Sequence, residues 1–558
     1  MPTGAELFAT ALLDLGIDRI FNLVGDHLNE VLVEVQRHGL RIIHMRHESG
    51  VTHAADAWAR ITRAPAVALF TGGPGHTNSI TGIATAQLAG SPLIAISGSR
   101  ASTLGERQAF QDIDQVSMTR PVVKWAAQTP TAGLVPFYLR RAFAEANSGR
   151  KGAVHLTIPV DVFSGDTAAP ARVPLRSAPV RPPPDAADID QAVALLKAAE
   201  RPIVIAGSGI WWSGAELELR EFIEKTSLPL YTITMARGAV SDQHPLCLGY
   251  ADPALNRAVR IAFPEADLVL VVGKRIDYRL AFGGPRVFSP SAKFIQIDVH
   301  PQEFGINRKV DLAILAGAKS TLRALTAATE KQVRSQWLDR LSALRQDADH
   351  QLSSAADSNA AHSNVDSPLH PAAFYRELKR WLPANTRYSW DGGDFVHWGR
   401  ASIPATVPGG WLRLGPLATI GSALPNAIAL KLAYPDDPVV LITGDGSLGF
   451  YIAELDTLVR YGLPVIVIVG NDGGWGLERE LQASASSDGS TVACELRRTR
   501  YDIVMQGFGG VGENIDRLEQ VEGAVARALS SKLPSLLNVN VRGARSPFTE
   551  WNISARKK

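Results

Sequence analysis

The sequence contains very little cysteine: only Cys247 and Cys494 occur among 558 residues. Two cysteines cannot form a disulfide framework or a cysteine metal cage, so a reducing, cytoplasmic setting is expected. The sequence also lacks an apolar run of membrane-spanning length, and its first residues have no basic start followed by an apolar segment. We therefore expect neither membrane association nor a signal peptide.

The sequence also has no large excess of positive or negative charge: its formal net charge is only +2, and its basic residues are dispersed. Nucleic-acid binding usually needs a clustered basic stripe, so a nucleic-acid partner is not expected. Hydrophobic residues make up 46% and charged residues 20% of the chain, as is usual for a globular protein. The length is too great for one core and indicates several domains.

Two polar segments divide the chain. Residues 167–188 are rich in proline and alanine, and residues 347–367 are rich in serine, aspartate and histidine, with little to bury. They predict an N-terminal domain at 1–166, a middle domain at 189–346, a C-terminal domain at 368–545, and a tail or lid at 546–558.

Each domain contains short apolar runs that end in glycine-rich turns, such as AVALFTGG, ADLVLVVG and PVVLITGDG. Continuous β-branched runs of this kind are typical of parallel strands buried on both faces. The predicted fold class is therefore α/β, with three doubly wound parallel-sheet domains. In such sheets ligands bind at the carboxyl ends of the strands.

Two acidic turns follow neighbouring predicted strands of the third domain. Gly444-Asp445-Gly446-Ser447 follows the run PVVLIT, and Asn471-Asp472-Gly473-Gly474 follows LPVIVIV, 27 positions further on. That spacing holds one helix and one strand, so both aspartates are expected at the same edge of the sheet. Mg²⁺ prefers oxygen ligands, which Asp445, Asp472 and a backbone carbonyl near Gly474 would supply. Taken alone, the first turn is equally consistent with a strand-to-helix connection, and the second turn favours a site.

A dinucleotide-dependent hydride transfer is the main alternative for an α/β protein. The stretch GSGIWWSG from Gly207 has two glycines of that fingerprint, but Trp212 stands where the third glycine belongs. A tryptophan there would prevent close helix–strand packing, so we exclude this alternative.

The two acidic turns resemble the thiamine-diphosphate enzyme superfamily, whose signature is GDG followed by a pair of asparagines. Here Asp472 replaces the second asparagine, which keeps an oxygen ligand and adds a negative charge. The resemblance covers nearly the whole chain. It implies thiamine diphosphate and Mg²⁺ as cofactors, an N-terminal pyrimidine-binding domain, a nucleotide-binding-like middle domain, a C-terminal diphosphate-binding domain, and a homodimer or homotetramer.

The resemblance also implies coenzyme-binding residues. Glu48 matches the carboxylate that activates the coenzyme, although alone it would be an ordinary acid in a first helical turn. Ile420 matches the apolar wedge, and the Ala418 carbonyl matches the acceptor of the aminopyrimidine hydrogen bond. Further cofactor-binding candidates are Gly444, Gly446, Ser447, Gly474, Trp475, Asp394 and Phe395.

The remaining catalytic candidates are His27, His76, Gln111 and Glu495. The histidines lie in glycine-rich turns after predicted strands and would be able to shuttle protons, although a lone histidine is usually structural. In the middle domain ADP or FAD is a further possible cofactor, with Arg150, Arg275 and Asp298 at the matching positions. That domain would equally be consistent with an empty structural role.

The reaction is predicted from local resemblances. DGGDFVHWGR from Asp391 and ELRRTRYD from Glu495 are similar to bacterial 2-hydroxyacyl-CoA lyases, whereas GDGSLGFYIAELDTLVRYGLP resembles benzaldehyde lyase. We therefore expect a small-molecule enzyme that reversibly cleaves a 2-hydroxyacyl thioester to a carbonyl compound and formyl-CoA. The alternatives are an acetolactate-synthase-like or benzaldehyde-lyase-like carboligase on free 2-keto acids or aldehydes, and an inactive binding or regulatory homologue.

Overall fold

The computed structural model describes residues 1–168, 182–360 and 368–556. The chain divides into two compact units. The first comprises Met1–Val180, Leu414–Pro435 and Phe450–Leu463, and the second comprises Arg181–Arg413, Asp436–Gly449 and Pro464–Lys558. Each unit is considered by itself below.

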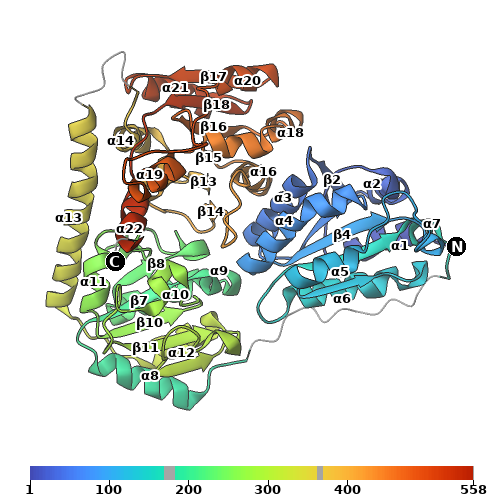
Figure 1. The fold of residues 1–558 in the computed structure, drawn as a ribbon. Coiled ribbons are helices and arrows are strands. Elements are labelled where there is room, and N and C mark those ends of the chain that lie inside the picture. The colour runs from blue at the N-terminus through green and yellow to red at the C-terminus, as the bar shows by residue number, and fades with distance from the viewer. Residues whose placement is uncertain (169–181, 361–367, 557–558) are drawn as a thin grey trace. The chain divides into compact units, whose positions relative to one another are not determined.

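The first unit contains a six-stranded parallel sheet, drawn in blue to teal in Figure 1. Its strand order is β2-β1-β3-β4-β6-β5. Its strands are β1 (Arg19–Asn22), β2 (Arg41–His44), β3 (Ala66–Phe70), β4 (Leu93–Ser99), β5 (Trp125–Gln128) and β6 (Val154–Pro159). Helices α1 (Gly4–Asp14), α2 (Asn29–Arg37) and α6 (Val135–Asn147) share one apolar cluster with these strands. Helices α3 (Glu48–Thr62) and α4 (Pro74–Ala89) pack on each other.

The second unit contains two sheets. The middle sheet has the order β12-β11-β10-β7-β8-β9 and is parallel throughout. Its strands are β7 (Pro202–Ala206), β8 (Leu230–Thr232), β9 (Cys247–Tyr250), β10 (Leu268–Val272), β11 (Lys293–Asp298) and β12 (Leu312–Leu315). One apolar cluster joins it to α8 (Ala186–Ala198), α10 (Glu216–Thr226) and α12 (Ala318–Ala328). A second cluster joins it to α11 (Val259–Glu265) and α13 (Ser335–Ala360).

The third sheet is also parallel, in the order β14-β13-β15-β16-β18-β17. Its strands are β13 (Arg387–Trp390), β14 (Trp411–Arg413), β15 (Val439–Gly444), β16 (Val465–Asn471), β17 (Val511–Ile515) and β18 (Ser535–Asn540). Helices α14 (Pro371–Trp381), α15 (Asp394–Ser402) and α21 (Gln520–Ser530) contribute to its apolar cluster. Three parallel α/β sheets confirm the predicted fold class.

The second predicted linker differs from the expectation. Helix α13 continues to Ala360, so residues 347–360 are helical, whereas 361–367 lie outside the described residues. Ala348, Leu352 and Ala356 recur every four residues, and each contacts an apolar cluster of the second unit. The segment is therefore a helix that buries one narrow apolar stripe. Its mainly polar composition is the reason that it was predicted as a linker. The first predicted linker falls largely on residues 169–181, outside the described part.

The predicted tail contains a helix, α22 (Pro547–Arg556). Arg286 stacks on the Trp551 ring with its guanidinium carbon 3.5 Å from the ring centroid, and Arg257 pairs with Glu550 at 2.6 Å. These contacts attach α22 to the middle domain. Throughout the described ranges, no helix combines the length and apolar character needed to cross a membrane.

Candidate functional site

Two acidic side chains meet at the carboxyl ends of β15 and β16. The strands are neighbours, with Gly444 paired to Gly470, so Asp445 and Asp472 emerge side by side. Asp445 Oδ2 accepts a hydrogen bond of 3.1 Å from the Gly474 backbone N–H. The strand order thus places Asp445 and Asp472 at the same edge of the sheet, as expected from the spacing of the two turns.

Burial, together with the charge of Asp472, raises the pKa of Asp445 to about 7. Burial also raises the pKa of Asp472, against the opposing effect of Arg479 and Arg498. The charge of Asp472 destabilises the ionised form of Asp445, and a divalent cation between the two carboxylates would remove that penalty. Among the described residues, no group of three or more acidic, histidine or cysteine side chains is arranged so that it could hold a metal ion. A cation here would therefore need further oxygen ligands from phosphate, water or backbone.

Two glycines permit close packing around the acidic turns. A Cβ on Gly446 would lie 2.7 Å from a ring carbon of Trp475, and Gly470 lies directly against the Phe395 ring. Trp475 immediately precedes α19 (Gly476–Ala485). The structure therefore brings Gly444, Gly446, Ser447, Gly474 and Trp475 into the neighbourhood of Asp445, with Phe395 packed on the strand that leads to Asp472.

The segment around Glu495 pairs with the second acidic turn. Glu495 forms an antiparallel bridge with Gly474, and the Leu496 N–H donates to the Gly473 carbonyl at 2.7 Å. Arg498 Nη1 donates to the Asn471 carbonyl at 2.7 Å. This pairing braces the turn that carries Asp472.

Arg479 is a residue that the sequence analysis missed. Its guanidinium donates to both carboxylate oxygens of Glu495, at 2.9 and 3.0 Å, and lies 3.5 Å from Asp472 Oδ2. Glu495 itself is largely exposed. Since Arg479 stands on the helix after the turn, seven positions from Asp472, the only sequence signal was the unusual carboxylate that needs a counter-charge.

The Asp394 carboxylate is hydrogen-bonded to residues of the C-terminal tail. Its Oδ1 accepts hydrogen bonds from the Ser546 N–H at 3.1 Å and from Thr549 Oγ1 at 2.6 Å, and from Ser546 Oγ. Burial raises the pKa of Asp394 to about 6, although these hydrogen bonds oppose the shift. In this structure Asp394 anchors the start of α22, and a contact with a cofactor remains a prediction.

In the first unit, Glu48 opens α3, and its Oε2 accepts a hydrogen bond of 3.0 Å from Asn78 Nδ2. The His47 ring caps the same helix by accepting from the Ser49 N–H at 3.1 Å. Glu48 is half-buried. The carboxylate is thereby oriented by Asn78 while remaining accessible.

The two predicted histidines have different surroundings. His27 Nδ1 accepts from the Gly72 N–H at 3.2 Å and lies 2.8 Å from Thr71 Oγ1, which places the proton of the neutral ring on Nε2. His76 is fully buried between Thr119 Oγ1, at 2.9 Å, and Ser97 Oγ, at 3.1 Å. Burial lowers the pKa of His27 and lowers that of His76 to about 4, so both rings are neutral at pH 7.

Gln111 adopts a φ of 57° and packs its side chain over Gly73. The nearby Gln115, which the sequence analysis missed, accepts from the Gly73 N–H at 3.1 Å and donates to the Gly98 carbonyl at 3.1 Å. Buried glutamine contacts of this kind hold the loop in one conformation.

Ala418 has a φ of 59°, in the left-handed region that favours glycine. The alanine is thus accommodated with some backbone strain. Ile420 lies two residues further on and is half-buried. Both belong to the first compact unit.

The nucleotide candidates fall into two places. Arg275 lines a cavity of about 200 Å³ in the middle domain, together with Asp277, Gln296, Asn307 and Arg308 among others. Asp298 ends β11, and its Oδ1 accepts from the His300 N–H at 3.0 Å. Arg150 belongs to the first unit, where it approaches the Leu88 carbonyl. A nucleotide cofactor remains a prediction.

Three family models match the chain: the thiamine pyrophosphate enzyme N-terminal TPP binding domain at residues 2–118, the central domain at 189–325, and the C-terminal TPP binding domain at 391–539. The chain therefore belongs to the thiamine pyrophosphate (thiamine diphosphate) enzymes. The predictions of this superfamily, of an enzyme and of thiamine diphosphate are confirmed.

Relatives extend over nearly the whole chain. The acetolactate synthase large subunit IlvG of Mycobacterium tuberculosis is 35% identical over 96% of this chain and 95% of its own length. The 2-hydroxyacyl-CoA lyase 2 of Caenorhabditis elegans is 30% identical over 99% of this chain and 91% of its own length. The 2-hydroxyacyl-CoA lyase 2 of Homo sapiens is 31% identical over 99% of this chain and 92% of its own length. The relatives thus carry names from both reaction branches considered above.

A first prediction concerns the pH dependence of Mg²⁺ binding. Because the pKa of Asp445 is about 7, this carboxyl is protonated in acid and must lose its proton to bind a cation. We expect the apparent Mg²⁺ affinity, measured by titration calorimetry, to fall about tenfold per pH unit below pH 7 and to level off above it. A flat profile between pH 5.5 and 8 would show that Asp445 is not a ligand.

A second prediction uses Asp472→Asn. The amide keeps an oxygen ligand but removes the charge that raises the pKa of Asp445. The inflection of the Mg²⁺ profile should therefore move to lower pH, with activity retained. The matched control is Glu495→Gln, which removes the negative charge of the other carboxylate that pairs with Arg479 and leaves Asp445 and Asp472 unchanged. Complete inactivation by Asp472→Asn would contradict the assignment.

Proposed function

We propose that this thiamine-diphosphate enzyme also requires Mg²⁺ and cleaves the carbon–carbon bond of a 2-hydroxyacyl thioester, giving an aldehyde or ketone and a formyl thioester, in a reversible reaction. The observation that carries this proposal is the position of Glu495–Asp502. This stretch resembles 2-hydroxyacyl-CoA lyases, and it pairs directly with the turn that bears Asp472. The Tyr501 hydroxyl in the same stretch donates to the Asp445 carbonyl at 3.2 Å.

Asp445 and Asp472 fit a magnesium ion that neutralises a diphosphate, since they form a partly buried acidic pair with raised pKa values. The Gly474 N–H and the pairing with Leu496 hold the turn in place. Bound thiamine diphosphate would supply a nucleophilic carbon and an electron sink. The residues supply orientation, charge and proton transfer.

Glu48 is proposed to share a proton with the pyrimidine ring nitrogen. Asn78 donates to Oε2 and so fixes the carboxylate orientation. Neutral His27, with its proton on Nε2, can donate a hydrogen bond to a substrate oxygen. Because both ring nitrogens of His76 contact hydroxyl groups inside the domain, His76 is proposed to position the adjoining loop.

Acetolactate synthesis from free 2-keto acids is the second candidate. It is favoured by one observation: the mycobacterial protein of that name shares 35% identity with this chain, against 30–32% for the 2-hydroxyacyl-CoA lyases 2 of nematode, fish and mammals. Sequence identity in this range accompanies a shared fold and coenzyme more reliably than a shared substrate.

The third prediction separates these candidates. The holoenzyme is incubated in parallel with 2-hydroxyacyl-CoA thioesters and with pyruvate, and products are identified by mass spectrometry. We expect formyl-CoA and the matching carbonyl compound from the thioesters. If acetolactate is formed from pyruvate and no thioester is cleaved, acetolactate synthesis becomes the supported function in place of thioester cleavage. The Asp445→Ala variant controls for reaction without bound coenzyme.

The fourth prediction concerns Glu48→Gln. The amide still contacts the ring nitrogen but cannot share an acidic proton, so coenzyme affinity should persist while activity falls by about 10²–10⁴-fold. Exchange of the thiazolium proton with deuterium, followed by quenched-flow NMR, should slow in parallel. Glu30→Gln, an exposed acid on α2, is the control. Unchanged exchange in Glu48→Gln would exclude Glu48 as the activating carboxylate.

A further inference from the structure

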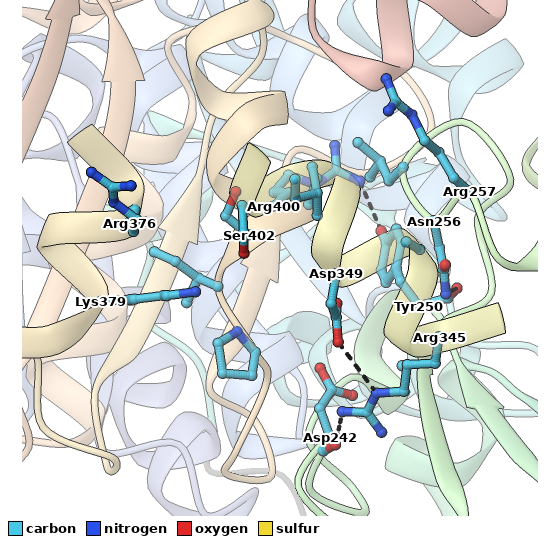
Figure 2. A pocket seen from close by; sticks show the side chains of 18 of the residues that line it. Asp242, Tyr250, Asn256, Arg257, Arg345, Asp349, Arg376, Lys379, Arg400 and Ser402 are labelled. Carbon is cyan, nitrogen blue, oxygen red and sulfur yellow. Dashed lines mark hydrogen bonds and ion pairs between the residues drawn. The ribbon is translucent and has the colours of Figure 1, made fainter. Parts of the chain in front are cut away.

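A cavity of about 370 Å³ lies within the second compact unit, and none of the predicted site residues lines it. Its walls come from residues 237–257 of the middle domain, from α13 and α14, and from the end of α15 (Figure 2). The volume is at the lower end of the range for small-molecule pockets, about 300–1,000 Å³.

The charged lining is strongly unbalanced. Basic side chains outnumber acidic ones, and they are Arg237, Arg257, Arg345, Arg376, Lys379 and Arg400 against Asp242 and Asp349. Acidic groups within and beside the cavity are already engaged. Asp242 holds Arg237 through two hydrogen bonds, and Asp357 and Glu550 hold Arg376 and Arg257.

Arg400 is the buried cation without such a partner. Its side chain is 2% exposed, and Nη2 donates to the Tyr250 hydroxyl at 2.8 Å. Its Nε and Nη1 atoms have no acceptor in the described part of the chain. Burial and the neighbouring Arg413 lower the pKa of Arg400 to about 9. A buried charge without a counter-charge is costly, so an anion nearby would be stabilising.

The pKa of the Tyr250 hydroxyl also indicates an excess of positive charge around Arg400. Burial opposes ionisation of its hydroxyl, but Arg400 and Arg413 outweigh burial and lower the pKa of Tyr250 to about 8. Arg413 Nη1 also donates to this oxygen, at 3.2 Å. Two guanidinium groups thus donate to the same hydroxyl oxygen at the cavity wall.

Lys379 adds an accessible cation. It extends from α14 toward the interior in Figure 2. Burial raises the pKa of Asp349, and the charges of Arg345 and Lys379 oppose that shift. The one acid on the opposite wall, Asp349, faces Arg345, with Nε 3.9 Å from Oδ2. Positive charge is therefore in excess both inside the cavity and at its edge.

We propose that this cavity binds a small anion, a phosphate or carboxylate compound, whose charge complements Arg400 and Lys379. The anion would be distinct from the diphosphate of the coenzyme, since Asp445 and Asp472 do not line the cavity.

The fifth prediction tests this site by calorimetry on the holoenzyme saturated with thiamine diphosphate and Mg²⁺, so that the diphosphate site is already filled. The probes are inorganic phosphate, inorganic pyrophosphate and succinate, which separate phosphate from carboxylate recognition. We expect at least one probe to bind and to raise the melting temperature. Arg400→Gln should weaken that binding by about tenfold or more, because it removes a buried charge.

Because a buried arginine can be needed for folding, the deciding comparison uses neighbouring surface residues. Lys379→Gln should weaken binding about threefold, as an exposed ion pair would. Arg380→Gln, which removes the same charge from a residue outside the cavity that pairs with Glu377, should leave it unchanged. Weaker binding in Lys379→Gln alone supports the site. Equal binding in both variants, or no binding of any probe to the parent protein, overturns it.

Discussion

Two neighbouring carboxylates, Asp445 and Asp472, are withdrawn from solvent in the third domain, and the contacts around them offset the cost of burying their charge. Parallel pairing of β15 and β16 brings the two carboxylates to one sheet edge, where burial penalises their charge. Without the Gly474 N–H and the guanidinium groups of Arg479 and Arg498, both would favour the protonated form. The surrounding contacts therefore oppose the effect of burial on the two carboxylates.

Arg479 shows how the unusual carboxylate is tolerated. A second asparagine would need no counter-charge, whereas Asp472 introduces a partly buried negative charge 3.5 Å from Arg479. The same guanidinium grips Glu495 through two hydrogen bonds. Arg479 therefore contributes both to charge compensation, together with Arg498, and to the attachment of the Glu495 segment to the turn that carries Asp472.

The strands and the acidic pair were predictable because their signals are local. A buried parallel strand needs a continuous apolar run, and a turn at its end needs glycine, so PVVLITGDG predicts both β15 and the position of Asp445. Helix α13 was missed because Ala348, Leu352 and Ala356 bury only a narrow stripe among polar residues. Arg479 and Arg400 were missed because their importance comes from partners distant in sequence, or from the lack of one.

Helix α15 connects Asp394 and Phe395, which were predicted as site residues from the sequence, with Arg400, which was not. It begins with Asp394 and carries Arg400 in its last turn, an arrangement that complements the helix dipole at both ends. Asp394 binds the start of α22, and Phe395 packs on Gly470 of the strand that leads to Asp472. Arg400, at the other end, is part of the cationic cavity. Since no Cβ fits between Gly470 and the Phe395 ring, a displacement of this nine-residue helix would act directly on β16. The cavity and the acidic pair are thus joined by one helix with little room to move.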